Sequence, residues 1–183
     1  MPSSSSVRAE VSTWVGAYSL SARRFHGHVA WVPSHPERSQ LLVEVDMRSL
    51  HSSVPLAAKL ARSESFLDTE RFPWACFRSN QIHWNRANPS VEGELSLHGV
   101  TRAILTPGRL TPLPQEVGPH SLLLESRFRV LRDDYSIRSN DFLELLISDY
   151  VTVELTLRVQ LAAATKFRPW RCSEAPLEPT APR

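Results

Sequence analysis

The sequence of 183 residues has few cysteines and no long apolar run. Its two cysteines, Cys76 and Cys172, stand far apart and outside any CxxC or Cys/His pattern, which argues against a zinc site. The two cysteines could form one disulfide, but we expect both to be free thiols. The N-terminal residues 1–6 have neither the basic start nor the apolar core of a signal peptide, so we expect a cytoplasmic protein. The apolar runs are too short to predict a transmembrane segment.

Excess charge and catalytic motifs are missing as well. The formal net charge is +2, and the basic residues are scattered without a run of lysine or arginine, so nucleic acid is not an expected partner. No G-x-S-x-G nucleophile motif and no glycine-rich phosphate loop occurs. These absences remove the common hydrolase and nucleotide-binding classes.

The sequence is rich in alternation of apolar and polar side chains. In residues 149–159, the apolar residues Val151, Val153, Leu155, Leu157 and Val159 alternate with Thr152, Glu154, Thr156 and Arg158. Residues 121–131, 89–99 and 41–47 follow the same pattern, and residues 74–79 and 7–14 follow it more weakly. Successive side chains of a strand point to opposite faces, so the pattern predicts strands with one dry and one wet face.

The predicted strands are long, about 37 Å for eleven residues. Long two-faced strands favour an all-β fold, an extended antiparallel β-barrel of about eight strands whose interior holds one ligand or is filled by side chains. Residues 53–65 predict one short amphipathic helix. Residues 132–148 are expected to fold back over one barrel end, and Pro107, Pro112, Pro114 and Pro119 to mark a loop. We place the barrel at residues 1–164 and a proline-rich, loosely ordered tail at 165–183.

Four segments resemble the YceI-like polyisoprenoid-binding family. They are SESFLDTERFP at 63–73 with FRS at 77–79, VEGELSLHGVTR at 91–102, LRDDYSI at 131–137 and ISDYV at 147–151. The second, similar to a "G-x-L-T-I-H-G-V-T-K" motif, is the most specific. Ser136 departs from the family pattern by standing at a position where glycine is usual, and the arginine-aspartate-rich helix start is missing around residues 55–60. The resemblance implies a lipocalin-like barrel that holds an isoprenoid quinone or polyprenyl chain.

The resemblance and the strand parity together give a set of candidate ligand-binding residues. These are Val43, Val45, Phe66, Phe77, Leu95, Leu97, Phe128, Val130, Tyr135, Phe142, Val153 and Leu155. The predicted function is non-catalytic binding or carriage of a long isoprenoid or fatty ligand, with no cofactor, no metal and no catalytic residue. A homodimer stays open.

Two other functions remain as alternatives. One is an enzyme that uses the barrel as a pocket, with His26, His28 or His98 as metal ligand or base; the other is a filled barrel that acts as a structural or stress-related dimer. We interpret His26 and His28 as surface residues, and His98 as fixing its turn through hydrogen bonds with Gly99 and Thr101. Arg132, Asp133 and Asp134 are expected to anchor the long connection by a salt bridge. The five tryptophans have no regular spacing, and we interpret most of them as packing groups.

Overall fold

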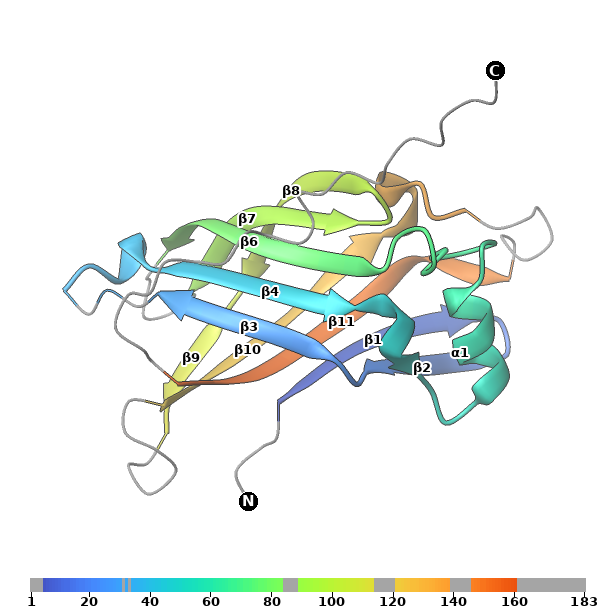
Figure 1. Ribbon diagram of the computed structural model, residues 1–183, viewed down its shortest axis with the longest axis horizontal. Helices are drawn as coiled ribbons and strands as arrows, with labels where there is room; N and C mark the ends of the chain where they lie inside the picture. Colours follow the sequence, from blue (N-terminus) through green and yellow to red (C-terminus); the bar gives the residue numbers. More distant parts are fainter. Residues whose placement is uncertain are drawn as a thin grey trace.

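The computed structural model describes residues 5–30, 32, 34–83, 89–113, 121–138 and 146–160. They form two curved antiparallel sheets that face each other (Figure 1). One sheet has the order β5 (Leu50–His51), β2 (Gly16–Ala22), β1 (Ser6–Thr13), β11 (Ile147–Gln160), β10 (Ser121–Leu131), β9 (Arg109–Pro112). The other has the order β3 (Phe25–Ala30), β4 (Gln40–Asp46), β6 (Trp74–His83), β7 (Ser90–Leu97), β8 (Val100–Pro107). The fold is therefore mostly β and lipocalin-like, as predicted.

Bent strands connect the two sheets. β2 and β3 are separated by two residues, β8 and β9 by Gly108, and β4 and β5 by the 3-10 helix η2 (Met47–Ser49). In each of these pairs, one piece belongs to one sheet and the next piece to the other. The described strands thus surround a common interior without closing into a single hydrogen-bonded barrel. If each bent pair is counted as one strand, the arrangement matches the predicted eight.

The predicted strand faces are confirmed in the long strands. β10 and β11 pair from Ser121↔Gln160 to Leu131↔Tyr150, and β1 pairs with the other edge of β11. Leu124, Leu157 and Val159 of the predicted dry faces are buried together with Leu41 and Val43 of β4 in the opposite sheet. The interior therefore lies between the dry faces of the two sheets, as the alternation requires.

Two expectations about local structure were wrong. Pro107 ends β8 and Pro112 ends β9, so this stretch is strand rather than loop; Pro114 and Pro119 lie outside the described residues. A proline is compatible with these positions because β8 and β9 are edge strands of their sheets. The face of β4 that carries Leu42, Glu44 and Asp46 was expected to be exposed to solvent, but all three residues are buried. Alternation within one strand does not reveal what covers its outer face.

The helix α1 (Pro55–Arg62) confirms the helix predicted at 53–65. Pro55 suits a first helical position because its missing N–H needs no partner there. Ala58 of α1 packs with Leu20, Met47 and Leu50, so the helix covers one end of the interior beside the β1–β2 turn (Figure 1). At the same end of the strands, the 3-10 helix η4 (Arg132–Tyr135) follows β10. A third 3-10 helix, η1 (Pro36–Arg38), precedes β4.

Candidate functional site: an apolar cavity between the sheets

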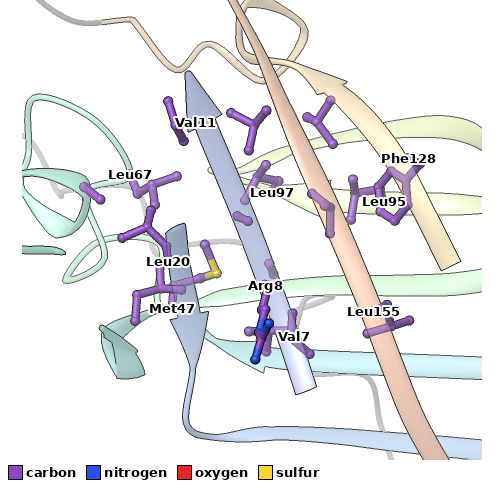
Figure 2. Close-up of a pocket in the computed structure, with 18 of the residues that line it drawn as sticks. Val7, Arg8, Val11, Leu20, Met47, Leu67, Leu95, Leu97, Phe128 and Leu155 are labelled. Carbon is purple, nitrogen blue, oxygen red and sulfur yellow. The ribbon is translucent and has the colours of Figure 1, made fainter. Parts of the chain in front are cut away.

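The space between the two sheets is a cavity of about 400 Å³. Figure 2 shows side chains from both sheets converging on it, including Val7 and Val11 of β1, Leu95 and Leu97 of β7, and Leu155 of β11. Leu67, from the segment that follows α1, also lines it. The lining comes from nine of the described strands and from α1, so the site is a property of the whole fold rather than of one loop.

Most of the lining is apolar, although Arg8 of β1 also lines the cavity (Figure 2), and two of its hydroxyl groups are bound to the backbone. The Thr106 hydroxyl donates to the Val91 carbonyl (3.5 Å) and the Ser126 hydroxyl donates to the Pro107 carbonyl (2.6 Å). A hydroxyl that already donates to the backbone is a weak anchor for a ligand. The cavity therefore selects for apolar area rather than for a particular pattern of hydrogen bonds.

Most of the candidate ligand-binding residues lie at this cavity. The residues that line it are Val43, Val45, Phe66, Phe77, Leu95, Leu97, Phe128, Val130, Val153 and Leu155. Tyr135 is not part of the lining but packs with Val130 and Ile137. Phe142 lies outside the described residues. Their contact with a ligand remains a prediction.

Sequence reasoning missed the lining residues that come from α1, among others. Leu56, Ala57, Leu60 and Ala61 of α1 line the cavity, and so does Val54 just before the helix. The amphipathic spacing of residues 53–65 was a signal for a buried helix face, but it did not say which end of the barrel that face would cover. Leu56 is 73% exposed although it lines the cavity, so the cavity reaches the surface beside α1.

His98 has a role different from the one expected. It occupies a left-handed conformation (φ 52°) next to Gly99 (φ 75°), and its Nδ1 lies 3.0 Å from the Tyr135 carbonyl oxygen. The Thr101 hydroxyl pairs with Ser96 at 2.7 Å instead. A Cβ on Gly99 would lie 2.6 Å from the Phe72 ring, so the turn needs glycine for space as well as for its positive φ. His98 therefore links the β7–β8 turn to η4 through its Nδ1.

Arg132 anchors the connection after β10, as predicted, but mainly through carbonyl groups. Its guanidinium is buried and donates to the carbonyl oxygens of Ile137 (3.2 Å), Ile147 (3.4 Å) and Ser148 (2.9 Å). Asp149 adds a looser ion pair at 3.7 Å. A buried guanidinium needs such a set of acceptors. Ser136, at the usual glycine position, adopts φ 55°, so the left-handed turn after η4 is kept despite the substitution.

Tyr135 brings an unusual polar atom close to the cavity. Its side chain is buried among residues that include Val130, Leu97 and Phe128, and its hydroxyl has no hydrogen-bond partner in the part of the chain that is described. Burial, with a contribution from the charge of Asp134, raises the pKa of Tyr135 to about 12. The hydroxyl therefore stays neutral and keeps its proton under physiological conditions.

A buried carboxylate stabilises the corner between β4 and η2. Asp46 accepts from the Arg24 Nε (3.0 Å), from the Arg48 Nε (3.0 Å) and from the Arg48 backbone N–H (3.1 Å). Burial alone would raise the pKa of Asp46, but the hydrogen bonds from Arg48 and Arg24 outweigh it and hold the pKa below its usual value. This network is structural, because Asp46 is not among the cavity residues.

Within the described ranges, no cluster of three or more histidine, cysteine, aspartate or glutamate side chains could hold a metal ion. His26 and His28 are both exposed on one face of β3, where the sequence placed them. Cys76, the cysteine that the structure describes, is disulfide-bonded, which corrects the expectation of free thiols. The other cysteine, Cys172, lies outside the described residues. No helix among the described residues is both long and apolar enough to cross a membrane.

Known structures share this fold at low sequence identity. Burkholderia cenocepacia BcnA matches 85% of this chain and 96% of its own at 14% identity, with a TM-score of 0.77. A polyisoprenoid-binding domain from Saccharophagus degradans matches 86% and 94% at 16% identity, with a TM-score of 0.65. The Campylobacter jejuni YceI protein matches 76% and 82% at 14% identity, with a TM-score of 0.65.

Sequence relatives agree with this grouping. A UPF0312 protein from Vibrio cholerae is 32% identical over 83 residues, which are 45% of this chain and 44% of that protein. A UPF0312 protein from Pseudomonas putida is 33% identical over 81 residues. These matches span less than half the length of the curated relatives. The model of the YceI-like domain matches residues 1–159, and the chain therefore belongs to the YceI-like domain family.

Proposed function

We propose that this protein holds one long apolar lipid, of the polyprenyl or isoprenoid-quinone class, in the cavity between its sheets and performs no chemistry on it. The observation that carries the proposal is the cavity itself, about 400 Å³ and lined almost wholly by aliphatic and aromatic side chains. The polyisoprenoid-binding domain from Saccharophagus degradans, which shares the fold, supports the choice of lipid class.

Energetics favour a long ligand over a short one. Burial of a five-carbon isoprene unit gives up to ~4 kcal/mol, at ~0.8 kcal/mol for each methylene-sized group. Association opposes binding by about 4–15 kcal/mol. Because most of the described lining is apolar, burial of the chain must supply most of the binding free energy, and several units must enter before binding becomes favourable.

The chemistry of the site supports binding rather than catalysis. His98 and Arg132 already bind backbone carbonyl groups, and the Tyr135 hydroxyl keeps its proton. His98 does not line the cavity, so its remaining ring nitrogen does not face the space proposed for the ligand. The disulfide of Cys76 favours an oxidising compartment over the cytoplasm.

Native mass spectrometry of the purified protein, followed by solvent extraction, tests the proposal. We expect one prenyl lipid per chain, and uptake of long-chain quinones by protein from which the lipid has been removed. Short analogues that carry the same quinone ring and one isoprene unit should bind far more weakly. An empty protein that takes up neither prenyl nor fatty chains would contradict the proposed function.

A further inference from the structure

We propose that the end of the barrel that carries α1 docks on the surface of a phospholipid bilayer, from which the ligand enters the cavity. The docking surface consists of Trp14 and Val15 at the β1–β2 turn and of Val54 and Leu56 at the start of α1. The inference rests on the proposed function for its purpose, but its own observations concern the outer surface of the protein.

The four side chains are exposed, although their chemistry favours burial. Trp14 is 75% exposed and Leu56 is 73% exposed, and Val15 and Val54 are exposed too. Most of the five tryptophans were expected to be packing residues, but Trp14 is exposed. It occupies the tip of a two-residue turn between Thr13 and Gly16, where the side chain projects beyond the sheet. Exposed large apolar residues that gather at one place mark a surface that is covered in use.

This surface is continuous with the cavity. Val54 and Leu56 are exposed and also line the cavity, so the same side chains form the outer surface and the inner wall. Thr13, adjacent to Trp14, and Tyr18 of β2 also line the cavity. A lipid that leaves a bilayer covered by these four residues would pass directly between them into the apolar interior.

The composition of the two segments fits a bilayer rather than a protein partner. Residues 11–22 contain no charged side chain, and residues 52–61 contain only Lys59, which is exposed. Tryptophan and aliphatic side chains beside a lysine are typical of segments that lie in a membrane interface. Two small projecting tips are also a poor match for the roughly 800 Å² that each partner contributes to a stable protein interface.

Vesicle flotation of the full chain tests the inference. Wild-type protein should float with phosphatidylcholine vesicles, and more strongly when phosphatidylglycerol is added, because Lys59 is the only charge in the two segments. The double variant Trp14→Ser, Val15→Ser should lower the partition coefficient by about tenfold or more. The variant Leu56→Gln should also lower the partition coefficient. Leu105→Gln is the matched control, because Leu105 is 64% exposed on β8 and is not part of the cavity lining.

The outcomes separate the inference from the proposed function. Trp14 and Val15 do not line the cavity, so their double variant should keep its thermal stability and its lipid content by native mass spectrometry. If wild-type protein carries a lipid but does not float, docking is wrong and the proposed function stands. If the protein floats as expected but carries no lipid, the proposed function is wrong and docking stands. An equal loss for Leu105→Gln, or a wild-type dimer that becomes monomeric in the Trp14→Ser, Val15→Ser variant, would also overturn the bilayer as the partner.

Discussion

The Nδ1 of His98 lies 3.0 Å from the carbonyl oxygen of Tyr135, which stands 37 positions later in the chain. A carbonyl group can only accept, so the ring carries its proton on Nδ1. The same ring packs edge-on against Phe72, with 4.5 Å between the ring centroids. Three segments that resemble the family motifs, around residues 72, 98 and 135, therefore meet at one point. Their residue types are explained by packing and hydrogen bonding.

Replacement of His98 should lower stability without emptying the cavity. His98→Ala removes the hydrogen bond to Tyr135 and places alanine in a left-handed conformation, and together these should lower the free energy of unfolding by about 1–3 kcal/mol. His98→Asn should lose less, because asparagine tolerates positive φ. Thermal unfolding of both variants measures the difference. Equal losses would mean that the backbone conformation contributes little.

Asp46 should make stability depend on pH in the acidic range. Its pKa in the folded protein lies below that of an unfolded aspartate, about 3.9. Its contribution is therefore fully present above the unfolded pKa and is lost as the pH falls through the folded pKa. Asp46→Asn should lower the free energy of unfolding at pH 7 by about 1–3 kcal/mol.

Urea titrations at a series of pH values check this expectation. The difference in free energy of unfolding between wild type and Asp46→Asn should narrow as the pH drops below about 4. Asp133→Asn is the control, because its pair with Arg138 is exposed and should contribute less than about 1 kcal/mol. A gap that stays constant down to pH 2 would show that the ionised carboxylate is not what stabilises the corner.

A large side chain inside the cavity should displace lipid. Val153 lines the cavity from β11, so Val153→Trp should reduce lipid content while lowering stability by at most about 1–3 kcal/mol. Glu154→Trp adds the same side chain to the opposite, exposed face and should change neither quantity. Native mass spectrometry and melting temperature are the two measurements. Normal lipid content in Val153→Trp would place the ligand elsewhere.

The disulfide of Cys76 should contribute to stability. Cys76 is disulfide-bonded, and loss of a native disulfide usually costs roughly 2–5 kcal/mol of stability. Cys76→Ser, or a reducing agent, should lower the melting temperature accordingly. Alkylation of the denatured, unreduced protein checks the premise, because labelling of both thiols would show that no disulfide exists.

Tyr135→Phe asks whether the buried hydroxyl has a partner. If it has none, removal of an unsatisfied polar atom should leave the free energy of unfolding unchanged or raise it by up to about 1 kcal/mol. The lipid-free protein is the suitable sample for this measurement. If the variant is as stable as wild type without lipid but less stable with it, the hydroxyl donates to the ligand.

The interior was the most predictable part of the molecule. In β11, Val153 and Leu155 face the cavity, as the alternation of apolar and polar residues predicted. A strand between an apolar interior and solvent places an apolar side chain at every second position. The most specific motif, at residues 91–102, also pointed to the right turn. Strand alternation therefore predicted the cavity wall well.

Features that depend on other segments could not be predicted in this way. Glu44 is buried although it stands on the strand face that was predicted to be exposed, because burial of that face depends on what covers it. Leu56 was assigned to a helix, but nothing local showed that the helix would lie over the cavity. The carbonyl group that His98 contacts carries no sequence signal at all, since every residue has one. Long-range placement, rather than local propensity, decided each of these points.

The pairing of β1 with β11 has a consequence for how the chain acquires its structure. Ser6 lies opposite Thr156, and Val11 lies opposite Val151. During synthesis, β1 therefore cannot pair with β11 until about 140 more residues have been added. Pairings between such distant residues make folding slow, because a long loop must close before the contacts form. Until β11 is made, the apolar faces of β1 and β10 lack the strand that lies between them. The nascent chain thus exposes the future cavity wall to solvent, and a chaperone or a hydrophobic ligand that covers this wall early should raise the yield of folded protein.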